Sequence, residues 1–146
     1  MRNLVQVEIL LAEDNEHDAE LAMRALRKSK VANKVVWVKD GAEALDFLFR
    51  RGVYSERLNE HPRLVLLDLK MPKVDGLQVL AEIKSDESTK TIPVVVMTSS
   101  REESDLVETY RLGVNSYIVK PVDFDQFVEV IATVGLYWAV VNKVPA

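Results

Sequence analysis

Short apolar runs alternate along the chain with segments whose apolar residues recur every three or four positions. The apolar runs predict five strands, at Val5–Ala12, Asn33–Lys39, Arg63–Asp68, Thr91–Met97 and Ser116–Val119. The periodic segments predict five helices, at Glu16–Ser29, Ala42–Phe49, Leu77–Lys84, Glu102–Arg111 and from Asp123 to about Val141. This strict alternation of strand and helix is typical of a parallel sheet with helices on both faces.

The connector Arg50–Pro62 interrupts the regular pattern, because it is polar and longer than most loops between a helix and a strand. Its composition fits a surface loop, a partly helical segment or a contact with a partner.

Length and composition limit the protein classes that this chain could represent. A chain of 146 residues with 48% hydrophobic residues fits one globular domain, residues 1–146, with a helical extension from about residue 135. Cysteine is absent, so no disulfide or thiolate metal site is expected, and a cytoplasmic location is predicted. The net charge of -4 argues against nucleic-acid binding. The apolar run Val134–Val141 is too short to span a membrane, and no targeting segment is recognisable.

Polar residues that can take part in binding or catalysis follow four of the predicted strands at their carboxyl ends. They are Glu13 and Asp14 after the first strand, Asp68 at the end of the third, Thr98 after the fourth and Lys120 after the fifth. The carboxyl ends of parallel strands share one edge of the sheet, where open α/β folds carry their chemistry. Each residue alone has an ordinary explanation as a cap or turn residue, but together and in this order they predict a site.

Three carboxylates in one cleft repel one another, and a hard divalent cation such as Mg²⁺ relieves that repulsion. Asp68 can act as a nucleophile toward phosphorus and form an aspartyl phosphate. Lys120 offers a point charge for a phosphoryl oxygen, and the Thr98 hydroxyl can donate to another. The pattern therefore predicts Mg²⁺-dependent phosphoryl transfer.

The chain resembles a receiver domain, the phospho-accepting module of two-component response regulators. The landmarks are Glu13-Asp14, Asp68 with Met71-Pro72 and Asp75-Gly76 behind it, Thr98, and Lys120-Pro121. They cover Val5 to about Val134. The resemblance implies a flavodoxin-like (CheY-like), doubly wound, five-stranded sheet in the order 2-1-3-4-5, and a sensor histidine kinase as phosphoryl donor.

Roles for individual residues follow from the same resemblance. It implies Mg²⁺ held by Asp14, Asp68 and the backbone carbonyl of Lys70, with Glu13 acting mostly through a bound water. Asp68 would be the phosphoryl acceptor, and Thr98 and Lys120 would hold the phosphoryl group. Tyr117 would be the aromatic switch residue, so that phosphorylation remodels the surface of the fourth helix, fifth strand and fifth helix. Slow self-dephosphorylation is expected rather than enzymatic turnover.

Two residues near the acceptor depart from the common receiver pattern or vary within it. Lys70 stands where Asn or a smaller polar residue is frequent, and Ser100, two residues after Thr98, is too short to position a water. We hypothesise that this pair sets the lifetime of the phosphoryl group.

The last predicted helix has an apolar core face and then almost no polar side. Phe127 belongs to the core-facing stripe, and Tyr137 and Trp138 lie in the later segment. Apolar helical surface at a chain end is most simply covered by a second chain, so we predict a two-fold homodimer built on Phe127, Tyr137 and Trp138. The alternative is that the helix packs on its own domain.

The long connector and the Tyr-Trp tail also resemble the stand-alone regulators that accompany phytochrome-type histidine kinases. This resemblance implies a light-sensing kinase as the donor.

Two other function classes compete with the receiver interpretation. A haloacid-dehalogenase-like phosphohydrolase also uses a strand-end Asp with Mg²⁺, but it needs an acid two residues later, where this chain has Lys70. A flavin-binding module would need a Gly-rich phosphate loop where Glu13-Asp14 stand. A metal site made of His17 and His61 is disfavoured because nothing in the sequence brings the two together.

Overall fold

The computed structural model describes residues 8–29, 34–57, 61–98, 111–114, 116–120 and 125–129. Its five strands form one parallel sheet in the order β2-β1-β3-β4-β5, as predicted. The strands are β1 (Glu8–Ala12), β2 (Lys34–Val38), β3 (Leu64–Asp68), β4 (Val94–Thr98) and β5 (Ser116–Val119). The sheet changes direction at β1, whose neighbours are β2 and β3, and the strands end along one edge.

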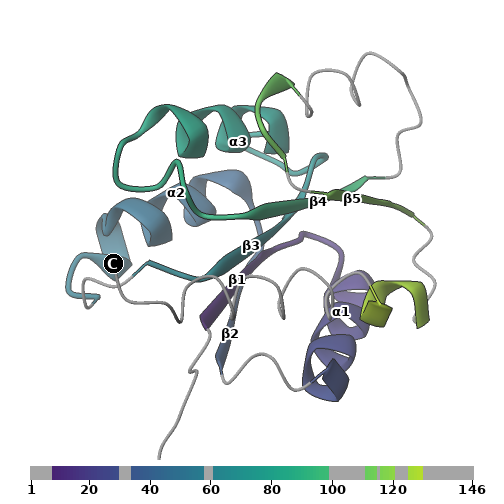
Figure 1. The fold of residues 1–146 in the computed structure, drawn as a ribbon. Helices are drawn as coiled ribbons and strands as arrows, with labels where there is room; N and C mark the ends of the chain where they lie inside the picture. The colour runs from purple at the N-terminus through teal and green to yellow at the C-terminus, as the bar shows by residue number, and fades with distance from the viewer. Residues whose placement is uncertain are drawn as a thin grey trace, which may run out of the picture.

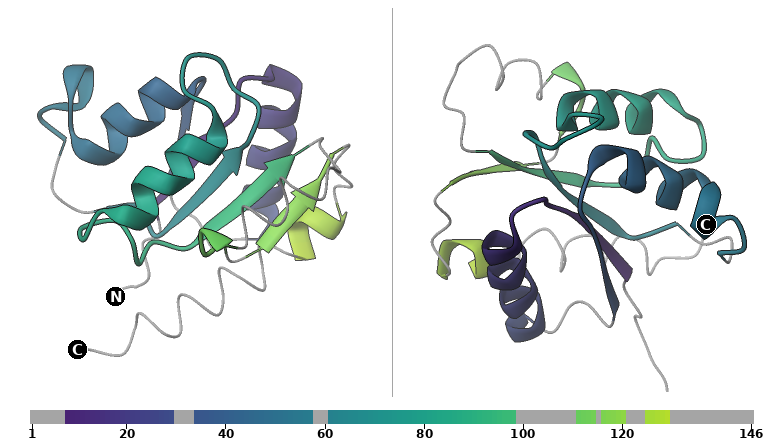
Figure 2. Two further views of the ribbon diagram at one scale, coloured as in Figure 1. Left: turned by 90° about the horizontal axis from the view of Figure 1, so that it is seen from above. Right: turned by 180° about the vertical axis from the view of Figure 1, so that it is seen from behind.

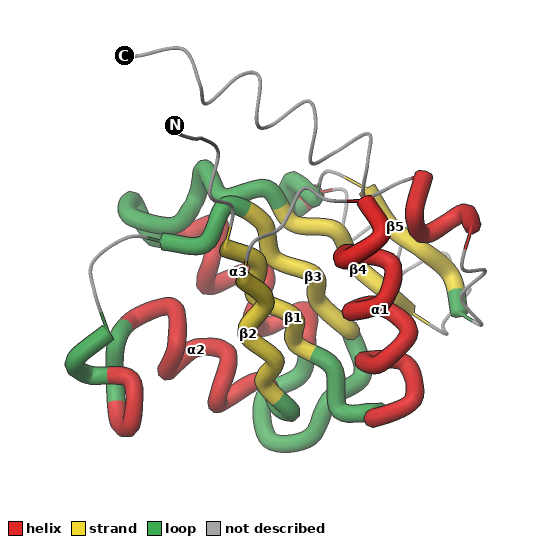
Figure 3. Tube along the Cα trace, turned by 90° about the horizontal axis from the view of Figure 1, so that it is seen from below, coloured by secondary structure: helices red, strands yellow, loops and turns green. Residues whose placement is uncertain are grey.

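Helices cover both faces of this sheet (Figure 1). The helices are α1 (Glu16–Ser29), α2 (Gly41–Phe49), α3 (Gly76–Ser85) and the short 3-10 helix η1 (Gly52–Tyr54). Helices α2 and α3 lie on one face, and α1 and the helical segment 125–129 lie on the other (Figures 1 and 2). The tube in Figure 3 shows the same order of strands from below. The arrangement confirms the doubly wound, CheY-like architecture.

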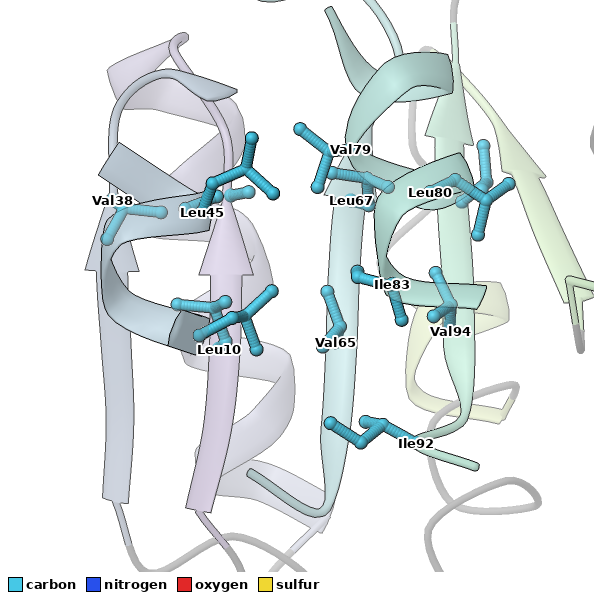
Figure 4. Close-up of a cluster of buried hydrophobic side chains, with 14 of the residues drawn as sticks. Leu10, Val38, Leu45, Val65, Leu67, Val79, Leu80, Ile83, Ile92 and Val94 are labelled. Carbon is cyan, nitrogen blue, oxygen red and sulfur yellow. The ribbon is translucent and has the colours of Figure 1, made fainter. Parts of the chain in front are cut away.

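Two buried clusters hold the layers together, one on each face of the sheet. Figure 4 shows the cluster between the sheet and α2 and α3, with Leu10, Val65 and Val94 on the strands and Leu45, Leu80 and Ile83 on the helices. Strands β3 and β4 are buried along their whole length, which explains their unbroken apolar sequences. Within the described residues, no helix has the length and apolar character needed to cross a bilayer.

Side-chain caps fix where the helices begin. The carboxylates of Asp40 and Asp75 accept from Glu43 N and Gln78 N, and so α2 and α3 begin at glycines one residue earlier than predicted. Helix α1 begins at Glu16 as predicted, and Asn15 Oδ1 accepts from Asp18 N in its first turn.

Strand β4 begins at Val94, three residues later than predicted. Ile92 N donates to Thr89 O at 2.9 Å, so the preceding residues close a turn. Pro93 lacks an N–H, and its carbonyl accepts from Val65 N at the start of the pairing with β3. In the long connector, the partly helical alternative is confirmed by η1.

Several predictions fall on residues outside the described ranges. These are the helix Glu102–Arg111 apart from Arg111, most of the final helix, the extension from about residue 135, and the side chains of Ser100, Tyr137 and Trp138.

Candidate functional site

Three acidic side chains meet where β1 and β3 end at the carboxyl edge of the sheet. Ala12 is paired with Leu67, so Glu13 and Asp68 follow on neighbouring strands. Glu13, Asp14 and Asp68 each offer a carboxylate oxygen, and these oxygens all lie within 4.8 Å of one another. Glu13 and Asp68 are buried, at 0% and 3% exposure, whereas Asp14 is exposed. The sequence-predicted acids therefore form one cluster.

The ammonium group of Lys120 lies among these acids. The last residues of β4 and β5 are paired, and Lys120 N donates to Thr98 O at 2.8 Å. The lysine therefore lies beside the end of β4, and β4 is the neighbour of β3 in the sheet. Its Nζ lies 2.8 Å from Glu13 Oε1 and 3.3 Å from Asp68 Oδ2. Only 12% of the lysine side chain is exposed, so these contacts are poorly screened by solvent.

Asp18, which sequence reasoning missed, is a third carboxylate at the lysine. It lies in the first turn of α1, and its Oδ2 is 3.0 Å from Lys120 Nζ. A helix of the length of α1 that follows β1 directly must begin near the edge where β1 ends. The sequence could have indicated this contact, because Asp18 lies one helical turn after Asn15 and therefore close to the sheet edge where α1 begins.

Burial and charge shift the ionisation of the site in opposite directions. Burial raises the pKa of Glu13 to about 7, against the lowering effect of the bond to Lys120. Burial also raises the pKa of Asp68, again opposed by Lys120 and by the N–H of Lys70. Burial alone would lower the pKa of Lys120, but the bonds to Glu13 and Asp18 and the charge of Asp68 raise it overall. The lysine therefore stays charged at neutral pH.

The loop after β3 holds Asp68 in a defined orientation. Lys70 N donates to Asp68 Oδ1 at 3.2 Å, and Gly76 N donates to Leu69 O at 2.8 Å. A Cβ on Gly76 would lie 2.3 Å from the backbone oxygen of Asp68, so only glycine allows α3 to start this close. The Asp-Gly pair at residues 75–76 thus allows α3 to pack closely against the backbone of Asp68.

Thr98 and Tyr117 come from the two strands beyond β3. Thr98 is the last residue of β4 and is fully buried, and Tyr117, in β5, is partly buried against the cluster below α2 and α3. Tyr117 is paired with Val96, two residues before Thr98. Thr98, the predicted hydroxyl residue, and Tyr117, the predicted aromatic switch residue, therefore lie on the adjacent strands β4 and β5.

Phe127, in the helical segment 125–129, is 1% exposed within its own chain. Its ring belongs to the cluster between the sheet and α1. This burial makes Phe127 a core residue and not an exposed dimer contact. Tyr137 and Trp138, the other two predicted dimer residues, lie outside the described residues. His17, exposed on α1, and His61, before β3, lie on elements at different places in the fold.

The acidic cluster has the chemistry of a site for a hard divalent cation. Its donors are carboxylate oxygens, and two of the three are buried in a place where uncompensated charge is costly. Lys120 supplies one positive charge, whereas the site holds four carboxyl groups, the three of the acidic cluster and that of Asp18. The residues present therefore fit a bound cation such as Mg²⁺.

Known proteins that are similar to this chain agree with the receiver-domain resemblance of its sequence. The family model described as "Response regulator receiver domain" matches residues 9–132. The probable methanogenesis regulatory protein FilR2 of Methanothrix harundinacea is 42% identical over 142 residues, covering 94% of this chain and 86% of that protein. Response regulator Rcp1 of Synechocystis is 37% identical over 138 residues, covering 94% and 92%.

Solved structures with high similarity include two phytochrome response regulators and the response regulator Rcp1. Bacteriophytochrome response regulator RtBRR is 52% identical with a TM-score of 0.82, covering 96% of this chain and 84% of its own. The phosphorylated cyanobacterial phytochrome response regulator RcpA is 43% identical with a TM-score of 0.79, covering 91% and 94%. The Mn²⁺-bound form of Rcp1 is 36% identical with a TM-score of 0.80, covering 96% and 99%.

Proposed function

The chain belongs to the response regulator receiver domain family, and from this premise we propose that Asp68 accepts a phosphoryl group from a histidine kinase. One observation carries the proposal: the Asp68 carboxylate lies beside two further carboxylates and the Lys120 ammonium at the sheet edge. Such a cluster combines a nucleophile with groups that compensate charge, which is what phosphoryl transfer requires.

The transfer forms one bond and breaks one bond. An oxygen of Asp68 attacks phosphorus, the O–P bond forms, and the N–P bond to the kinase histidine breaks. The imidazole nitrogen keeps the electron pair of the broken bond and takes up a proton. Lys120, 3.3 Å from Asp68 Oδ2, is close enough to contact an oxygen of the transferred group, and the hydroxyl of the buried Thr98 would donate to another.

Glu13, Asp14 and Asp68 would hold the divalent cation, with the carbonyl of Lys70 as the ligand that the family resemblance adds. When bound, Mg²⁺ compensates the negative charge of the phosphoryl oxygens. The chain itself contributes the fixed carboxylates, since Asn15 N donates to Glu13 Oε2 at 3.0 Å and Lys70 N donates to Asp68 Oδ1. The same groups would support slow self-dephosphorylation.

The signal would leave the site through the strands beyond β3. A phosphoryl group on Asp68 would draw the Thr98 hydroxyl toward it, and the ring of Tyr117 would fill the space that is vacated. The two movements would change the surface formed by the fourth helix, β5 and the fifth helix, to which the segment 125–129 belongs.

The names of the similar proteins support a phytochrome-type histidine kinase as the donor. RcpA is a cyanobacterial phytochrome response regulator and RtBRR is a bacteriophytochrome response regulator, and the chain spans most of the length of each. We place the protein in the cytoplasm with its kinase, and we propose a homodimer through the C-terminal helix with Tyr137 and Trp138 at the contact.

Phosphorylation by a small donor tests the proposal. The full chain is incubated with acetyl phosphate and Mg²⁺ and examined by intact mass spectrometry, with hydroxylamine treatment to identify an acyl phosphate. Wild-type protein is expected to gain one hydroxylamine-labile phosphoryl group, and Asp68→Asn none. An unmodified wild type, or an Asp68→Asn variant that is labelled equally, would refute the assignment of Asp68.

The comparisons give no support to the haloacid-dehalogenase-like alternative. The position two residues after Asp68 is the exposed Lys70, which cannot serve as the general acid of such an enzyme.

A further inference from the structure

The indole of Trp37 is bonded to the backbone from which two of the three acids project. Trp37 is the fourth residue of β2, and its Nε1 donates to the carbonyl oxygen of Glu13 at 2.7 Å, across 24 residues of sequence. On the other side of the same residue, Glu13 N donates to Val38 O at 3.0 Å. Both backbone polar groups of Glu13 are therefore tied to β2, one of them by a side chain.

This bond acts where the strand pairing has ended. The ladder between β1 and β2 runs to Ala12 and Val38, so the carbonyl of Glu13 has no partner in that ladder. A distance of 2.7 Å is at the short end of the range for N–H···O bonds. Trp37 is partly buried against the cluster between the sheet and α1, which restricts its ring. The indole therefore holds in place the residue that follows the last paired residue of β1, which is Glu13 at the site.

Fixing the Glu13 carbonyl also fixes the start of Asp14. The C=O of Glu13 and the N and Cα of Asp14 lie in one planar peptide unit. The Glu13 carboxylate is held separately, by Asn15 N and by Lys120. The exposed Asp14 carboxylate projects from the Cα that this peptide unit positions. Loss of the indole bond would let the peptide unit rotate and change the separation of the acids.

We propose that Trp37 is a positioning residue for the divalent cation, acting through the Glu13–Asp14 peptide without touching the ion. The inference depends on the proposed function, because it presupposes a cation held by Glu13, Asp14 and Asp68. One hydrogen bond of ordinary strength corresponds to a change in cation affinity of about fivefold.

A tryptophan analogue separates the hydrogen bond from the packing of the ring. The chain has two tryptophans, so in a Trp138→Phe background only position 37 takes up an analogue supplied during expression. Benzothienylalanine replaces the indole N–H by sulfur and removes the donor while keeping the shape. 5-Fluorotryptophan keeps the N–H and is the matched control. Mn²⁺ binding to each protein is measured by calorimetry, and thermal unfolding is measured without metal.

The fluorotryptophan protein is expected to bind Mn²⁺ like its parent, and the benzothienyl protein about fivefold more weakly. Equal affinities in the two would overturn the role of Trp37 and leave the metal site intact. A parent protein that binds no Mn²⁺ would instead refute the proposed metal site, and the inference with it.

Two ordinary substitutions test the inference even if the analogue protein folds poorly. Trp37→Phe removes the donor, and Val35→Ala removes packing from the same cluster two residues earlier on β2. Weakened Mn²⁺ binding is expected in Trp37→Phe only. If Val35→Ala loses as much affinity, packing explains the effect and the positioning role is overturned.

Discussion

The Lys120 ammonium lies closer to Asp18, at 3.0 Å, than to Asp68, at 3.3 Å. Asp18 is 26% exposed and Lys120 12%, so the pair is only partly screened by solvent. A carboxylate on α1 therefore shares the lysine that contacts Asp68. Lys120 is held between the helix and the sheet edge, and its position depends on both.

Replacing Asp18 by Asn should slow phosphorylation of Asp68 by about three- to tenfold, since the lysine loses one of its anchors. The free energy of unfolding should fall by about 1 kcal/mol, the upper range for a partly exposed ion pair. Initial rates of labelling by acetyl phosphate and denaturant unfolding check both effects. Glu20→Gln makes the same charge change on α1, at an exposed residue whose ion pair with Arg27 is 3.9 Å long. Equal labelling rates in the two variants would limit Asp18 to a structural role.

Mg²⁺ should stabilise the protein through the acidic cluster. A cation that binds only the folded state adds about 1.4 kcal/mol at ten times its dissociation constant. We expect Asp14→Asn to lose most of this gain, because it removes the one exposed carboxylate of the three. Glu87→Gln, an exposed acid far along the chain in the turn after α3, is the control. Thermal unfolding with and without Mg²⁺ measures the gain. A full Mg²⁺ response in Asp14→Asn would exclude Asp14 as a ligand.

The sequence predicted the main acids but not the residues that support them. Strands β3 and β4 are buried on both faces, so their unbroken apolar runs located Asp68 and Thr98 at the sheet edge. Trp37 could not be found in this way. Its contact with Glu13 depends on the register that pairs Leu11 with Trp37. The hydrophobic pattern indicates which face of the sheet a strand residue occupies, but a shift by two residues preserves that pattern and would remove the contact.

The start of β4 is a second feature that the hydrophobic pattern did not predict correctly. Thr91 and Ile92 look like strand residues, but the turn bond from Ile92 N to Thr89 O takes them out of the ladder. A local turn hydrogen bond between residues three positions apart overrode the strand propensity there. The early starts of α2 and α3 have a different cause, the capping by Asp40 and Asp75, and these caps were readable from the Asp-Gly pairs.

Gly41→Ala should destabilise the protein by about 1–3 kcal/mol, the usual cost of inserting a methyl group into a packed site. A Cβ at position 41 would lie 1.8 Å from the carbonyl oxygen of Val74, in the loop between β3 and α3. Since that loop also carries Lys70, we expect weaker Mg²⁺ stabilisation as well. Denaturant unfolding measures the loss. A variant with the wild-type midpoint would mean that the loop can move aside without cost.

Trp138→Ala should convert the proposed dimer into a monomer. The predicted final helix is apolar nearly all round in this region, and such a surface is normally covered. Sedimentation velocity of the full chain measures the mass. Val53→Ala is a suitable control, because Val53 is a large apolar residue that is 90% exposed on η1. An unchanged mass for Trp138→Ala would count against the C-terminal contact.

Tyr54 should make the stability of the protein fall with pH in the alkaline range. Its hydroxyl donates to Glu43 Oε2 at 2.7 Å and joins η1 to α2. Burial, followed by this hydrogen bond and the charges of Glu43 and Asp46, raises the pKa of Tyr54 to about 12. Between pH 10 and 12 the folded chain therefore keeps a proton that the unfolded chain has released. Folding binds protons in this window, so the stability contributed by Tyr54 is present below pH 10 and is lost toward pH 12.

Tyr54→Phe isolates this contribution from that of the other tyrosines, which both proteins retain. Below pH 10 the variant should be less stable by about 1 kcal/mol, a value reduced from that of a fully buried bond because Tyr54 is partly exposed. The difference between the two proteins should shrink as the pH rises from 10 to 12. Urea unfolding at a series of pH values measures it. A difference that stays constant over this range would show that the hydroxyl contributes through packing and not through its bond to Glu43.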